Sequence, residues 1–170
     1  LTTVQSTSPA DGSNPTDSNS MLPQTPHKKL IMQSKIGAVT ISTASTTTYT
    51  VTVAAKAGGG GNAFYIDGVQ APSITINEGS SAIFNLSDNT VDSHPFYLST
   101  TSDGSHNSGS VYTTGVTFKI NGSSVSQSAY ASGYTSATTR ALEITVAIGA
   151  PTLYYYCSSH PGMGNSISTP

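Results

Sequence analysis

The sequence predicts an all-β sandwich that follows an extended N-terminal arm. Residues 142–148 place an apolar side chain at every second position, which is the pattern of a strand with one buried face. Short runs rich in Thr and Val recur between clusters of Gly, Asn and Ser, at a spacing typical of sandwiches and barrels. With 170 residues, the chain is long enough for one domain with an appendage.

The arm is expected to span residues 1–48. Residues 1–27 hold four prolines among Ser, Thr, Asn and Asp, so we expect this part to become ordered only when it docks on another molecule. Residues 28–48 are more apolar and are expected to add one or two accessory strands. Within them, Thr46–Thr48 fits either a strand or a linker. The domain proper is therefore predicted to span residues 49–170.

The first strands of the domain follow from alternation and turn signals. Residues 49–54 alternate regularly and predict a half-buried strand. The four glycines at 58–61 lack the Lys-Ser/Thr pair and the following helix of a phosphate-binding loop, so we interpret them as a hairpin turn. Residues 64–66 predict a second strand that ends at an Asp-Gly turn, and residues 74–76 and 82–86 predict two more.

The second half of the domain has clear strands on either side of one segment without a clear pattern. Residues 96–98 and 116–120 predict strands, whereas the rest of segment 110–140 has few large apolar side chains and predicts long loops at the sandwich edge. The last strand is expected at residues 153–157. Because side chains alternate, Cys157 is expected to face the core with Leu153 and Tyr155, and Tyr156 to face outward with Tyr154.

Charge and hydropathy exclude several classes of partner. Only 8% of the residues are charged, the net charge is −2 and no basic patch is present, so neither nucleic acid nor an anionic membrane is expected as a partner. No apolar run approaches the length of a membrane span. The single cysteine cannot form a disulfide within the chain, so the cysteine count does not indicate the redox compartment.

That cysteine begins the most informative stretch of the chain. Cys157, His160 and Met163 follow one another in the spacing C-x2-H-x2-M after an aromatic strand. Thiolate, imidazole and thioether suit copper, and two His and one Cys with a weak axial Met form the blue-copper arrangement. The second His must come from elsewhere, and His94, at the start of a predicted strand, is the best source. His106 lies among turn residues and His27 lies in the arm, so both are poorer candidates.

Two other interpretations of these residues stay open on the sequence alone. The cysteine can be a small buried hydrophobic residue whose spacing from His160 and Met163 is accidental. Alternatively, one Cys and two His can hold zinc, although structural zinc sites normally use four N or S ligands and no Met. Copper also binds such sites more tightly than zinc in the Irving–Williams order.

Over residues 49–165 the chain resembles the cupredoxins, and its ligand loop is most similar to those of amicyanin and pseudoazurin. The resemblance implies a Greek-key β-sandwich and one type-1 copper ion held by His94, Cys157, His160 and Met163. Tyr156 corresponds to a surface aromatic residue beside the metal, which implies a possible electron entry point. With four ligands supplied by the protein, no open coordination position is implied and no enzymatic turnover is expected.

A second resemblance covers residues 63–164. Segments 63–70, 94–104, 112–117 and 150–157 look like parts of cupredoxin-like domains in structural proteins of marine bacteriophages. It implies a virion surface module, of the decoration or fibre kind, whose arm contacts neighbouring subunits or the capsid. Its location would then be the virion surface or the extracellular space. The alternative is a soluble blue-copper electron-transfer protein, with a periplasmic location and a redox partner that the sequence does not identify.

Overall fold

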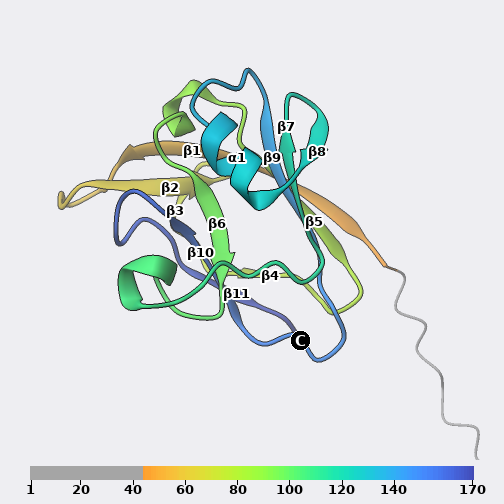
Figure 1. Cartoon of the computed structure of the whole chain (residues 1–170). Coiled ribbons are helices and arrows are strands. Elements are labelled where there is room, and N and C mark those ends of the chain that lie inside the picture. Colours follow the sequence, from red (N-terminus) through yellow and green to blue (C-terminus); the bar gives the residue numbers. More distant parts are fainter. Residues whose placement is uncertain (1–43) are drawn as a thin grey trace, which may run out of the picture. The chain divides into compact units, whose positions relative to one another are not determined.

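Two β-sheets make up the part of the protein that the computed structural model describes, residues 44–170. The accessory strands expected before residue 44 lie outside the described residues. The seven-stranded sheet runs, from edge to edge, through β3 (Val69–Gln70), β2 (Asn62–Ile66), β1 (Thr46–Ala55), β5 (Ser81–Asn85), β9 (Arg140–Thr145), β7 (Val116–Ile120) and β8 (Ser123–Val125) (Figure 1). The four-stranded sheet runs through β4 (Ile74–Thr75), β11 (Ser166–Ser168), β10 (Leu153–Cys157) and β6 (Phe96–Ser99).

The two sheets pack face to face around an aromatic core, so the predicted β-sandwich is confirmed. Phe64 of β2 and Phe84 of β5 meet Phe96 of β6, with ring centroids 5.0 and 4.9 Å apart, and Tyr155 of β10 stacks on Phe96 at 5.6 Å. All four rings are buried, and burying a side chain of this size stabilises the fold by roughly 1.5–3 kcal/mol. Phe96 thus anchors the beginning of β6 in the core, two residues after His94.

Strand pairing brings distant parts of the sequence together. β10 pairs antiparallel with β6, and this register places Cys157 opposite Phe96. β1 is shared between two partners: its first half runs parallel to β5, and its second half forms an antiparallel hairpin with β2. Because β1 begins at Thr46, the strand interpretation of Thr46–Thr48 is right, and the strand starts inside the segment assigned to the arm.

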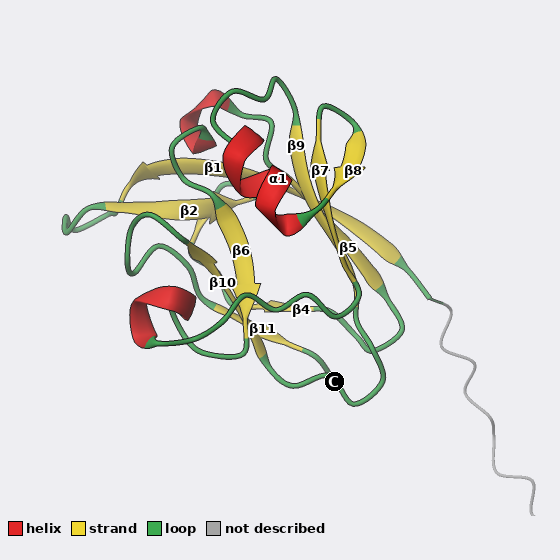
Figure 2. Ribbon diagram, in the orientation of Figure 1, coloured by secondary structure: helices red, strands yellow, loops and turns green. Residues whose placement is uncertain are grey.

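The helix α1 (Gln127–Gly133) occupies a segment for which the sequence predicted loops (Figure 2). Ser126 caps it, since its hydroxyl oxygen accepts a hydrogen bond from the Ala129 N–H at 3.2 Å. Tyr130 in the helix and Tyr134, its C-cap residue, are four positions apart and both fully buried, so they form the apolar side of this segment. The surrounding Ser and Gly residues have low helix propensity. The sequence therefore favoured loops here despite the Ser126 cap and the four-residue spacing of the two tyrosines.

Other boundaries also differ from the predicted ones. The strand predicted over residues 142–148 ends at Thr145, and Ile148 is 81% exposed, because the chain turns at Gly149 before the alternation is complete. A short strand, β11, follows the residues after Cys157, so β10 is not the last strand. Two 3₁₀ segments, η1 (Asn89–Val91) and η2 (Gly104–Asn107), lie before and after β6. None of the helical segments in residues 44–170 has the length and apolar character needed to span a membrane.

Candidate metal centre

His94, Cys157 and His160 come together at one end of the sandwich. The Cys157 Sγ lies 3.8 Å from Nδ1 of His94 and 3.7 Å from Nδ1 of His160. The centroids of the two imidazole rings are 4.6 Å apart, and the three possible ligand atoms all lie within 4.8 Å of one another. His94 and Cys157 are 63 positions apart in the chain. With His160 they form a cluster that can hold a metal ion.

The spacing of these atoms fits one shared ion. An ion with bonds of about 2.3 Å to sulfur and about 2.0 Å to nitrogen, at an angle of about 120°, separates the two ligand atoms by about 3.7 Å. The observed separations of 3.8 and 3.7 Å agree with this value. The two sulfur–nitrogen separations are therefore already those expected around a shared metal ion.

Met163 lies beside the same cluster. Its side chain is buried and, with His94 and His160, lines a cavity of about 380 Å³ whose other walls are Gly60, Gly61, Asn62 and Pro161. The Met163 carbonyl accepts a hydrogen bond from the Phe64 N–H at 2.9 Å, which ties this residue to β2. All four predicted site residues are thus at one place, three as a ligand cluster and Met163 in the adjoining wall.

Strand pairing positions the cysteine relative to His94. Cys157 is the last residue of β10, and the next residue, Ser158, donates a hydrogen bond from its N–H to the Pro95 carbonyl at 3.0 Å. The ladder between β10 and β6 therefore extends to the residue that follows His94. As a consequence, the thiol and the first imidazole are presented from two neighbouring strands at the same end of the sheet.

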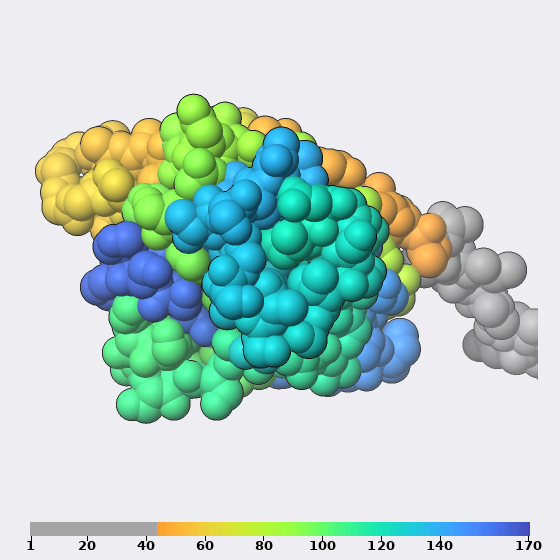
Figure 3. Space-filling view, turned by 45° about the horizontal axis from the view of Figure 1, so that its top comes forward, coloured from red at the N-terminus to blue at the C-terminus, as the bar shows by residue number. Residues whose placement is uncertain are grey.

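Two glycines shape the loop between β10 and β11, residues 158–165, which we call the ligand loop. Gly162 has a φ of +71° and donates its N–H to the Asp103 carboxylate at 2.8 Å. Gly164 packs so closely on β10 that a Cβ there would overlap the Tyr155 carbonyl. In Figure 3 the blue ligand loop lies between the yellow tip of the β1–β2 hairpin and the green η2 segment. The loop is therefore held on both sides.

Tyr156 is buried, which corrects the expectation that it faces the surface. The η2 segment covers it: a Cβ on Gly104 would overlap the Tyr156 ring, so only glycine lets the chain pass so close. Burial raises the pKa of Tyr156, and its hydrogen bonding with Ser105 acts in the opposite direction. A buried ring does not offer the surface entry point for electrons that the resemblance implied. Tyr154, also expected to face outward, is partly exposed.

His106, a poorer candidate by sequence, lies beside the cluster. Its Nε2 lies 2.9 Å from the carbonyl oxygen of Cys157, across 51 positions of the chain. His106 is not part of the ligand cluster among the described residues, but it contacts the backbone of the ligand. A contact between a loop and a distant strand leaves no signal in the pattern of neighbouring residues, so the sequence did not reveal it. His27, the other candidate set aside, lies outside the described residues.

Burial and polar neighbours shift the pKa values of His94 and Cys157. Burial, and then the neighbouring His160, lower the pKa of His94, which favours the neutral imidazole that binds metals. Burial raises the pKa of the Cys157 thiol, whereas the backbone N–H groups of Ser159 and His160 lower it. Binding of a metal must therefore displace the thiol proton. The two N–H groups near the sulfur help to stabilise the thiolate once it forms.

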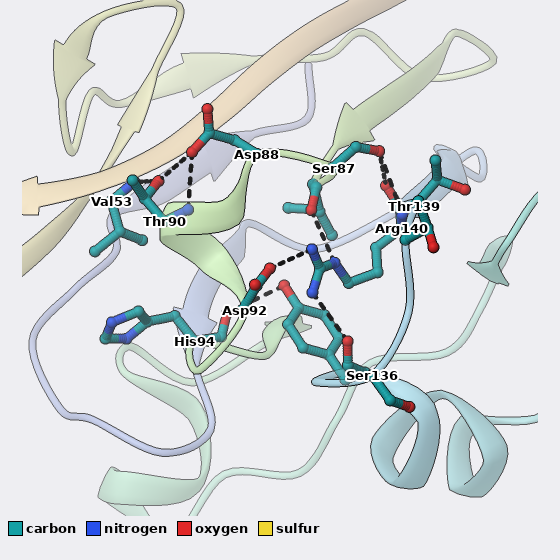
Figure 4. Close-up of polar contacts among 12 residues, drawn as sticks. Val53, Ser87, Asp88, Thr90, Asp92, His94, Ser136, Thr139 and Arg140 are labelled. Carbon is teal, nitrogen blue, oxygen red and sulfur yellow. Dashed lines mark hydrogen bonds and ion pairs between the residues drawn. The ribbon is translucent and has the colours of Figure 1, made fainter.

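The segment that leads to His94 is anchored from two sides (Figure 4). On one side, the Thr90 hydroxyl oxygen accepts a hydrogen bond from the Val53 N–H of β1 at 2.9 Å, and Asp88 caps the η1 turn through the Thr90 N–H. On the other side, Asp92 forms an ion pair with Arg140 of β9. These contacts fix η1 between two strands of the larger sheet.

Comparison with known proteins does not add a family to this description. No protein-family model matches the chain, and no curated protein matches it.

Proposed function

We propose that this domain is a cupredoxin-like module that holds one copper ion in a type-1 site. The ligands would be Cys157, His94 and His160, with Met163 as the weak axial ligand. The observation that carries the proposal is a buried thiol within 3.8 Å of two imidazole Nδ1 atoms, beside a buried thioether. A thioether favours copper over zinc, for which structural sites use N and S ligands without Met.

The topology supports a Greek-key sandwich of the cupredoxin kind. The chain passes between the two sheets at the β3–β4, β4–β5, β5–β6, β6–β7 and β9–β10 connections. Two pairs of strands are parallel: β1 with β5 inside the larger sheet, and β4 with β11 at one edge of the smaller sheet. His94 precedes β6, and the other ligands end or follow the neighbouring strand β10, as the resemblance implies.

Copper in such a site cycles between two oxidation states one electron apart. The residues of the chain would hold the ion and keep its surroundings constant. Cys157, His94 and Met163 are buried and restrain its coordination, whereas His160 is exposed and connects the site to the surface. We propose no enzymatic turnover.

The biological role we propose is that of a structural module on a virion surface. Its support is the resemblance of residues 63–164 to phage structural domains, together with an arm of 1–48 that would contact neighbouring subunits or the capsid. A soluble electron carrier is the second candidate. One observation favours it: His160 reaches the surface among Gly60, Gly61, Asn62 and Pro161, an uncharged surround on which a redox protein can dock.

The choice of metal is tested by competition. Native mass spectrometry of the reduced protein, exposed to equal amounts of copper(I) and zinc(II), should show one copper per chain. The Met163→Ala variant should take up a larger share of zinc, because the soft axial ligand is lost. Preferential zinc binding by the unaltered protein would contradict the copper proposal.

The role is tested by solution mass. As a structural module, the full chain should assemble or bind coat protein, and a variant that lacks residues 1–27 should lose this property while it keeps its metal. A full chain that stays monomeric at all concentrations, binds no coat protein and exchanges electrons rapidly between copies would favour the carrier.

A further inference from the structure

The helix α1 covers one edge of the smaller sheet. Among residues 44–170, β6 is the outer strand at this edge and pairs only with β10. Tyr130 and Tyr134 donate hydrogen bonds from their hydroxyl groups to the carbonyls of Phe96 and His94, each at 3.2 Å. Four residues of helix rise by about 6 Å and two residues of strand by about 6.7 Å, so the two spacings match. The helix thus supplies two donors where a partner strand would supply N–H groups.

A buried arginine holds this arrangement in place. Arg140 is 3% exposed, and its Nε and Nη1 donate hydrogen bonds to the carbonyls of Leu86 and Tyr134, both at 3.0 Å. Its Nη2 pairs with the Asp92 carboxylate, and the guanidinium carbon lies 5.1 Å from the centre of the Tyr134 ring. A buried charge is tolerated only when it is paired and hydrogen-bonded, and Arg140 meets both conditions. Both partners lie beside His94: Asp92 is two residues before it in the chain, and Tyr134 donates a hydrogen bond to its carbonyl.

The His94 ring has little else to hold it. Among the described residues, the only hydrogen-bond partner of the ring is the Cys157 sulfur, at 3.8 Å. Its backbone, in contrast, is bonded at both groups: the N–H donates to the Val91 carbonyl at 2.9 Å, and the carbonyl accepts from Tyr134. The direction of the imidazole therefore depends on the backbone and on the packing around it.

We propose that Tyr134 and Arg140 are positioning residues of the metal centre. They hold the backbone of His94 so that Nδ1 faces the Cys157 sulfur before the metal arrives. This inference rests on the proposed metal-binding function. Partners that orient a metal ligand typically change metal affinity by about 10–100-fold when they are removed.

Tyr130 provides a matched control for Tyr134. Both hydroxyl groups are on the same face of α1, both side chains are fully buried, and both donate to a β6-edge carbonyl at 3.2 Å. They differ in the residue that they hold. Tyr134 bonds the carbonyl of His94, a proposed ligand, whereas Tyr130 bonds the carbonyl of Phe96, which is not one. Removal of either hydroxyl group should destabilise the fold by a similar amount, but only Tyr134→Phe should disturb the metal site.

The test compares Tyr134→Phe with Tyr130→Phe in the full chain. We expect Tyr134→Phe to weaken the affinity for cobalt(II), a probe that does not oxidise the thiol, by about tenfold. Tyr130→Phe should change it by less than about twofold. In the metal-free proteins, hydrogen exchange of the His94 amide should accelerate more in Tyr134→Phe than in Tyr130→Phe. Equal effects of the two variants on affinity and exchange would overturn the proposal.

Failure of the copper proposal has a different signature. If the unaltered protein binds cobalt but gives no type-1 spectrum with copper, the copper assignment is wrong, and a selective cobalt defect in Tyr134→Phe still supports positioning. If it binds neither metal, the proposed function fails, and the exchange of the His94 amide alone decides whether Tyr134 positions this residue.

Discussion

His106 holds the backbone of Cys157: its imidazole Nε2–H donates a hydrogen bond to the carbonyl of the cysteine, over 2.9 Å. This contact joins η2, where His106 lies, to the last residue of β10. The same η2 turn covers Tyr156, and Asp103 at its start accepts the N–H of Gly162. One short segment therefore braces the cysteine, the residue before it and the loop after it.

Removal of this hydrogen bond should loosen the cysteine end of the site. His106→Ala is expected to lower the free energy of unfolding by about 1 kcal/mol and to weaken metal binding. His106→Gln, which keeps a side-chain N–H donor, should retain more of both properties. Urea denaturation and cobalt(II) titration measure the two effects, and identical behaviour of His106→Ala and the unaltered protein would show that the contact is inconsequential.

Gly104 should tolerate no side chain. In Gly104→Ala the new Cβ meets the buried Tyr156 ring at a φ of +49°, so we expect a loss of about 2–4 kcal/mol from the free energy of unfolding. Gly122→Ala is the control, because Gly122 has a φ of +78° with open space around it and should lose only about 1 kcal/mol through backbone strain. Similar losses in both variants would mean that Tyr156 is not packed against η2.

Arg140→Met should be far more damaging than the loss of an exposed ion pair. It leaves the carbonyls of the buried residues Leu86 and Tyr134 without their donor, whereas the Asp92 side chain is 45% exposed and stays hydrated, and we expect a loss of about 2–4 kcal/mol. The control is Lys119→Met, which removes the 2.7 Å pair with Glu143 on the exposed face of the sheet and should cost about 0–1 kcal/mol. Denaturation curves that shift equally would refute the assigned role of Arg140.

Buried tyrosines should limit stability at alkaline pH. Burial, and to a lesser degree Tyr156, raise the pKa of Tyr97 to about 12, and burial raises the pKa of Tyr155 further. In the unfolded chain these groups lose their protons near pH 10. The unfolded state therefore binds fewer protons above pH 10, and the free energy of unfolding should fall as the pH rises from about 10 to 12.

Tyrosinate absorbance and circular dichroism, followed together against pH, check this expectation. The buried tyrosines should ionise only as the β-sheet signal is lost. Reversible ionisation of all tyrosines near pH 10 in a folded protein would contradict the packing described for them.

The candidate site could be predicted from the sequence because three of its four residues lie close together in the chain. Cys157 ends β10, and His160 and Met163 follow it in the ligand loop, so the spacing of the three residues indicates the site directly. His94 required one more step, from its place at the start of a strand, and the pairing of β6 with β10 is what brings it to the sulfur. The strands followed from alternation, which is a property of neighbouring residues.

The contacts that the sequence did not reveal belong to a layer outside the two sheets. Alternation placed Tyr156 on the outer face of β10. The η2 segment covers that face, however, so the Tyr156 ring is buried rather than exposed. The helix α1 covers β6 in the same manner, through two tyrosines in a segment poor in helix formers. Such coverage depends on segments that lie 34 to 51 positions away in the chain, which a local pattern does not sample.

The spectrum of the protein after addition of one equivalent of copper(II) tests the central claim most directly. A thiolate bound to copper in a type-1 site should give an intense blue colour and a type-1 EPR signal. Cys157→Ser should abolish the colour, whereas Met163→Leu should keep it, because the axial bond is weak. A colourless copper complex of the unaltered protein, or a blue colour that survives in Cys157→Ser, would contradict the account.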